Sequence, residues 1–78
     1  MAFITEFSEL SSGSTGRDHS TCSAGWRVTE RAGERVLQID TYGSPDRQDA
    51  GTVSQSIQLD HETARALVAI INRVFPGA

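Results

Sequence analysis

Five side chains of this sequence are candidates for binding single-stranded nucleic acid. Four arginines can bind phosphate oxygens, and a tyrosine ring can stack on a base. These residues are Arg27, Arg31, Arg35, Tyr42 and Arg47, and the neutral polar side chains Gln38, Ser54 and Ser56 accompany them as further hydrogen-bonding groups. The pattern predicts a nucleic-acid-binding surface if the fold brings these residues onto one face.

The charge balance weighs against a general polyanion binder. Seven arginines and no lysine stand against ten acidic residues, so the net charge is −3 and the pI is near 5.1. Binding driven by release of counterions needs a basic surface. Arg31 and Arg35 lie beside Glu30 and Glu34, and Arg47 lies in an acidic loop. The alternative interpretation is therefore a set of solvated ion pairs, each contributing about 0–1 kcal/mol.

No pattern of catalytic residues is present. The sequence has no nucleophile beside a base and no glycine-rich phosphate loop, so we expect neither an enzyme nor a cofactor. His19 and Cys22 have a ligand-like spacing that His61 could join. Cys22 falls on the apolar side of a predicted strand, however, and we expect no metal site.

Length and cysteine content limit the architecture. The 78 residues form one predicted domain, 1–78, and a domain of this size is marginally stable unless oligomerisation reinforces it. The lone Cys22 excludes an intrachain disulfide and favours a reducing compartment, the cytoplasm. The first residues have neither a signal-peptide pattern nor a membrane-spanning run, so we expect no membrane partner.

Alternation of apolar and polar residues predicts an antiparallel sheet of about four strands. The predicted strands are 2–7, 21–30, 35–43 and 53–59, of which the second and third form a hairpin around Ala32 and Gly33. Trp26 should lie in the core. The Ser/Gly-rich segment 8–16 should be a flexible loop, and 44–51 an exposed one.

A C-terminal helix follows the last strand directly. Asp60 is a good N-cap, and Pro76 with Gly77 ends the helix. Its apolar stripe should face the sheet; the stripe consists of Ala64, Leu67, Val68, Ile71, Val74 and Phe75. Ala66 and Ile70 widen the apolar arc, which predicts a helix-mediated homodimer through Ala66, Ile70, Arg73 and Val74. The alternative is that Ile70 only flanks a small core.

The third and fourth predicted strands carry a resemblance to a known family. Val36-Leu37-Gln38-Ile39-Asp40-Thr41-Tyr42, and Ser56-Ile57-Gln58-Leu59-Asp60 leading into the helix, resemble the positive-cofactor-four family of transcriptional coactivators. The resemblance covers roughly residues 25–75. It implies a four-stranded curved sheet, helix-mediated dimerisation and binding of single-stranded nucleic acid. The family typically has a basic residue where this chain has Asp40, and basic residues where it has Ser54, Gln55 and Ser56.

Two overlapping segments are also similar to short uncharacterised prokaryotic proteins, which implies no activity. They are Leu37-Gln38-Ile39-Asp40-Thr41-Tyr42-Gly43-Ser44 and Val53-Ser54-Gln55-Ser56-Ile57-Gln58. The sequence therefore predicts an α+β fold, a curved antiparallel sheet followed by one C-terminal helix, and leaves two functions open. The first is a small coactivator-like module that binds single-stranded nucleic acid through its sheet face and hairpin loops. The second is a protein-interaction or assembly module in which the sheet face or a strand edge binds a protein partner.

Overall fold

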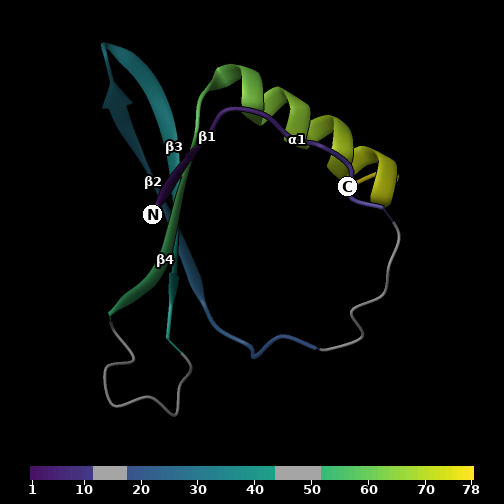
Figure 1. The fold of residues 1–78 in the computed structure, drawn as a ribbon, viewed down its shortest axis with the longest axis horizontal. Helices are drawn as coiled ribbons and strands as arrows, with labels where there is room; N and C mark the ends of the chain where they lie inside the picture. The colour runs from purple at the N-terminus through teal and green to yellow at the C-terminus, as the bar shows by residue number, and fades with distance from the viewer. Residues whose placement is uncertain (12–17, 44–51) are drawn as a thin grey trace.

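The chain forms a four-stranded sheet followed by one helix, as a computed structural model shows (Figure 1). The structure describes residues 1–11, 18–43 and 52–78. The elements are β1 (Ala2–Ile4), β2 (Ala24–Arg31), β3 (Glu34–Tyr42), β4 (Val53–Leu59) and α1 (His61–Val74). The spatial order of the strands is β1-β4-β3-β2. The predicted α+β class is confirmed, while most of the predicted loops at 8–16 and 44–51 lie outside the described residues.

The hairpin of β2 and β3 is closed by a two-residue turn. Ala32 and Gly33 both have positive φ, at 51° and 79°, and pair Arg31 with Glu34 across the turn. Two consecutive positive φ angles define the type I′ turn, whose twist matches that of the flanking strands. Gly33 adopts this conformation without strain, whereas Ala32 does so at a steric cost.

Strand register divides the sheet into two faces of opposite character. In β3, Leu37 and Ile39 lie opposite Leu59 and Ile57 of β4, and Val28 and Trp26 of β2 complete the two rows. The apolar face consists of Ala24, Trp26, Val28, Leu37, Ile39, Ile57 and Leu59. The alternate positions form the polar face, which consists of Arg27, Gln38, Asp40, Ser56 and Gln58. Alternation along each strand thus separates most polar from most apolar side chains. The exceptions are Arg35 and Gln55, which lie on the apolar face, and the buried Val36, which lies on the polar face.

The first strand corrects the prediction of a wholly antiparallel sheet. β1 pairs with β4 in parallel, with Ala2 opposite Ile57 and Ile4 opposite Leu59, so the sheet is mixed. A parallel pair needs a long connection, and the whole chain between β1 and β4 supplies one. The alternation of Phe3 with its neighbours indicates a strand in either direction. The sequence therefore does not show whether this strand pairs in parallel or antiparallel.

A single residue, Asp60, connects β4 to α1. The Asp60 carboxylate accepts a hydrogen bond from the Thr63 amide at 2.9 Å, and the Thr63 hydroxyl accepts one from the Asp60 amide at 3.0 Å. These reciprocal bonds form a capping box, which confirms Asp60 as the N-cap. Figure 1 shows α1 running out from the end of β4 and away from the strands. Within the described residues, no helix has the length and apolar character to cross a membrane.

The fully buried core is small because the helix does not cover the sheet. Val36 and Leu59 are the large side chains that the described structure buries almost completely. Trp26, predicted to be a core residue, is 74% exposed, and Val28 beside it is 58% exposed. The radius of gyration is 14.7 Å, against about 11–12 Å for a compact domain of this length. The fold therefore leaves a large part of its apolar surface uncovered.

The turn conformation predicts that Ala32→Asn stabilises the protein. Asparagine tolerates the left-handed region that alanine enters at a steric cost, so the gain should be about 0.5–1 kcal/mol. Urea unfolding of the two proteins at pH 7 measures the difference in the free energy of unfolding. The slope of that free energy against urea concentration should not change. Ala32→Val is the control and should lower the stability, because a β-branched side chain disfavours positive φ. An asparagine variant that unfolds at the same or lower urea concentration would contradict the assigned turn.

The capping box predicts a cost for Thr63→Val. The substitution preserves the shape of the buried side chain but leaves the Asp60 amide without its acceptor, so stability should fall by about 1–2 kcal/mol. Urea unfolding followed by helical circular dichroism measures the loss. Thr21→Val, at an exposed position before β2, is the matched control and should change little. Equal effects of the two substitutions would argue against the cap.

Candidate functional site

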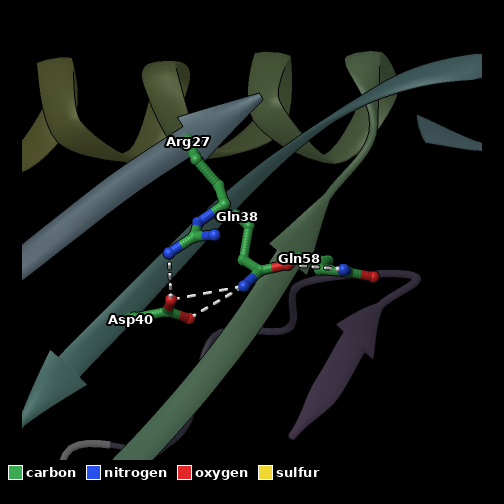
Figure 2. A network of polar contacts seen from close by, with 4 residues as sticks. All are labelled: Arg27, Gln38, Asp40 and Gln58. Carbon is green, nitrogen blue, oxygen red and sulfur yellow. Dashed lines mark hydrogen bonds and ion pairs between the residues drawn. The ribbon is translucent and has the colours of Figure 1, made fainter. Parts of the chain in front are cut away.

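A network of polar side chains crosses the middle of the polar face (Figure 2). Gln58 donates from Nε2 to Gln38 Oε1 at 2.9 Å, and Gln38 donates from its own Nε2 to both carboxylate oxygens of Asp40, at 3.1 and 3.3 Å. Arg27 Nη2 lies 3.8 Å from Asp40 Oδ2. The register explains this row, because Arg27, Gln38 and Gln58 are direct partners on three neighbouring strands.

Asp40 is the electrostatic centre of this network. Its side chain is buried, at 4% exposure of the residue. A hydrogen bond from the Ser56 side chain lowers the pKa of the Asp40 carboxyl below its ordinary value, and Gln38 and Arg27 lower it further, while burial acts in the opposite direction. The polar face therefore carries a carboxylate at its centre near neutral pH.

The network leaves little on this face for a phosphate to bind. Arg27 already has a carboxylate partner, although an ion pair with a largely exposed arginine is a weak one. In the described part of the chain, no buried side-chain nitrogen or oxygen lacks a hydrogen-bond partner. The amides of Gln38 and Gln58 are used within the protein, and the ionised Asp40 repels an approaching anion.

Arg31 and Tyr42 also contact other parts of the protein. The Arg31 guanidinium carbon lies 3.9 Å from the centre of the Phe3 ring, a cation–π geometry, and both side chains line a shallow hollow together with the buried Val36. Tyr42 is half-buried against Gly25, where a Cβ atom would lie 3.1 Å from the tyrosine hydroxyl. Neither group stands free above the sheet.

The remaining predicted nucleic-acid contacts do not join the polar face. Arg35 lies opposite Glu30 in the hairpin, and strand alternation places its side chain on the other face of the sheet from Arg27. Ser54 lies at the irregularity in the pairing of β3 with β4, and its hydroxyl lies 3.0 Å from that of Thr41. Arg47 lies outside the described residues. The structure therefore brings together Arg27, Arg31, Gln38, Tyr42 and Ser56 on one face, and it does not bring the full predicted set together.

The four residues of the predicted helix-mediated dimer lie in two different environments. Ala66 lines a hollow with Thr5, Glu6 and Phe7, and Arg73 Nη1 lies 3.7 Å from Glu9 Oε1. This flank of α1 thus lies against the chain's own N-terminal segment, which Figure 1 shows running beside the helix. Ile70 and Val74 are exposed. The dimer through these residues stays a prediction.

The surface that sequence reasoning missed lies between the apolar face and the helix. Trp26 and Val28 are exposed on β2, and a hollow beside Trp26 continues over Leu37 and Ile39. A second hollow joins Val28, Leu37 and Leu59 to Ala64 in the first turn of α1. We call the apolar face together with the exposed helix stripe of Val68, Ile71, Val74 and Phe75 the apolar groove. The sequence feature that could have indicated this open surface is the single-residue connection at Asp60, which leaves no loop between the last strand and the helix.

The residues considered as metal ligands do not assemble. Cys22 and His19 are exposed in the segment before β2, and His61 occupies the first turn of α1. Within residues 1–11, 18–43 and 52–78, no three side chains of histidine, cysteine, aspartate or glutamate lie close enough to hold a metal ion. The apolar groove and the polar face are therefore the surfaces on which a function can be argued.

No protein-family model matches this chain, and comparison with curated proteins and with solved structures gave no match either. The resemblance to the positive-cofactor-four family accordingly stays a prediction.

The environment of Asp40 predicts a dependence of stability on pH. The folded-state pKa lies below the ordinary value of 3.8, so the carboxylate stabilises the fold at pH values above that value. As the pH falls through 3.8 toward the folded-state pKa, the unfolded chain binds the proton first and this stabilisation is lost. Asp40→Asn should therefore lower the stability at pH 7 and flatten the decline between pH 5 and pH 2.5.

Urea unfolding at a series of pH values tests this prediction. Asp18→Asn, at an exposed position outside the network, is the control and should leave the curve nearly unchanged. Asp60 also has a lowered pKa, through its bonds to Thr63, so part of the pH dependence should remain in the Asp40 variant. An unchanged pH dependence in that variant would show that the network does not hold the carboxylate in its ionised form.

Proposed function

We propose that this chain is a protein-interaction module that binds a polypeptide in its apolar groove. The observation that carries the proposal is the exposure of Trp26 and Val28 on β2 and of Val68 on α1. On the polar face, by contrast, Gln38, Asp40 and Gln58 hydrogen-bond one another. An exposed contiguous apolar surface of this kind marks an interaction site in soluble proteins. The groove is therefore the surface that gains most free energy from a partner.

The composition of the groove suits a polypeptide partner. Tryptophan is among the residues that contribute most to protein interfaces, because burial of its large ring removes much apolar surface from water. Burial of apolar surface contributes roughly 25 cal/mol per Å² before the costs of association. Leu37 and Ile39 extend the apolar contact beside Trp26, and Glu34 and Arg35 line its hairpin end. A polypeptide with an apolar stripe, such as an amphipathic helix, fits these requirements.

Binding of single-stranded nucleic acid is the weaker proposal. Arg27, Arg31 and Tyr42 share the polar face, which supports it, but each contacts another side chain or backbone of the protein. The buried carboxylate of Asp40 lies 3.8 Å from Arg27 and opposes phosphate. We propose no catalytic role for the chain. We assign it to the cytoplasm because its one cysteine, Cys22, is free and exposed.

The proposal predicts where a photo-crosslinking amino acid captures polypeptides. A benzophenone side chain placed at position 26 or 68 should form polypeptide adducts in cells that produce the chain, because both positions line the groove. The same side chain at Thr21 or at Arg27, outside the groove, is the control and should form at least about tenfold fewer adducts, since a buried aromatic anchor dominates an interface. Gel mobility and mass spectrometry measure the adducts.

Two results would contradict the proposal. The first is equal capture at all four positions, which would indicate random collisions. The second is capture at position 27 alone, together with saturable binding of labelled single-stranded DNA or RNA by the purified protein at low salt. That combination would favour the polar face and the nucleic-acid function instead.

A further inference from the structure

We infer that the polypeptide that fills the apolar groove is a second copy of the same chain, with α1 of each copy packed on the apolar face of the other copy's sheet. This inference rests on the proposed function and names its partner. It differs from the predicted dimer through Ala66, Ile70, Arg73 and Val74, because it uses the sheet as well as the helix. Three observations carry it.

The first observation is that the helix cannot cover its own sheet. Asp60 is the only residue between Leu59 and His61, and reciprocal bonds with Thr63 hold both sides of the connection. A one-residue connection leaves no loop that could turn the helix back. The first turn, at Ala64, therefore reaches the apolar face, and the later turns run beyond it. The exposed stripe at Val68 and Ile71 lies on those later turns.

The second observation is that the two exposed surfaces complement each other. The sheet presents an apolar face without a helix upon it, and α1 presents an apolar stripe without a sheet beneath it. A second copy related by a two-fold axis supplies both missing parts at once, because each contact made by one copy is repeated by the other. The stripe that the sequence predicts to face the sheet then does so, on the sheet of the partner.

The third observation is the exposed area. The chain exposes 6847 Å², whereas a folded monomer of its mass exposes about 4,600 Å². The excess of about 2,200 Å² is an upper bound on the contribution of the groove, since all loops count toward it. Obligate dimers bury about 1,000–2,500 Å² on each subunit. The surplus surface is thus large enough for a stable dimer, and such burial would supply the core that Val36 and Leu59 alone do not.

The outer flank of the helix is compatible with this arrangement. Ala66 and Arg73 lie against the N-terminal segment of their own chain, at Phe7 and Glu9. The N-terminal segment therefore approaches this flank, while Ala66 is exposed and the side chains of Arg73 and Glu9 are 81% and 82% exposed. Val68 and Ile71, on the stripe, are also exposed.

Complementation between two variants tests the exchange. Trp26→Asp damages the sheet surface, and Val68→Asp damages the helix surface, so a homodimer of either variant has both of its contacts disrupted. Light scattering with size-exclusion chromatography should show a dimer for the unmodified chain and at least about a tenfold higher dissociation constant for each variant. An equimolar mixture should recover dimer, because one of its two contacts is intact in the mixed pair.

Further readouts keep the test independent of folding defects. Trp26 is the single tryptophan, so dilution of the unmodified protein should shift its fluorescence to longer wavelength as the dimer dissociates and the ring meets water. Thr21→Asp, at an exposed position outside the groove, is the control and should leave the dimer intact. Circular dichroism confirms that the variants are folded. A dimer unaffected by Trp26→Asp would overturn the exchange in favour of a helix–helix contact.

The inference and the proposed function fail in different ways. A chain that remains a monomer at all concentrations, yet forms adducts with other polypeptides at positions 26 and 68, would overturn the second copy as partner and leave the interaction module intact. Equal capture at groove and control positions would overturn both. Adducts with twice the mass of the chain support both.

Discussion

The connection at Asp60 is the constraint on which the rest of the structure depends. Its carboxylate and amide each bond to Thr63, which fixes the first helical turn to the last residue of the sheet. A flexible loop at this point would allow the amphipathic helix to fold back and bury its stripe on the apolar face. With a single residue the direction of α1 is determined by the cap, so its later turns leave the sheet. The exposure of Trp26, Val28 and Val68 follows from that geometry.

The two faces of the sheet have opposite requirements for a partner. On the polar face, hydrogen bonds from Ser56 and Gln38 stabilise the Asp40 carboxylate, and Gln58 extends the row across three strands. Because Gln38, Asp40 and Gln58 already bond to one another, these groups gain less from a ligand than unpaired ones would. On the apolar face the opposite holds, because every exposed valine or tryptophan costs free energy until something covers it. For this reason we propose the apolar face, and not the polar face, as the surface that binds a partner.

Local patterns predicted most of the elements. Alternation in 53–59 and the Asp-capped apolar periodicity after it located β4 and α1, and glycine at position 33 located the hairpin turn. The direction of β1 was not predictable, because a three-residue strand carries the same alternation in parallel and antiparallel pairing. The burial of Trp26 was predicted wrongly. Its alternation shows which face it occupies, and whether that face is covered depends on an element elsewhere in the chain.

The candidate site shows the same division. Strand alternation placed Arg27, Gln38, Asp40 and Ser56 on one face. It did not show that Asp40 would use the hydrogen-bonding capacity of its neighbours. Arg35 was assigned to the same surface although alternation carries it to the opposite face. Interactions between neighbouring strands depend on register, which links residues about twenty positions apart, such as Gln38 and Gln58.

By itself the sequence determined the local structure of this protein: strands that separate polar from apolar side chains, a turn that admits positive φ, and a helix capped by Asp60. Short-range sterics and hydrogen bonds between near neighbours are sufficient for these features. Only the tertiary structure decided that β1 runs parallel to β4, that Asp40 is held by its neighbours, and that the helix leaves the apolar face open. These outcomes depend on the relative placement of whole elements, which nearby residues do not specify.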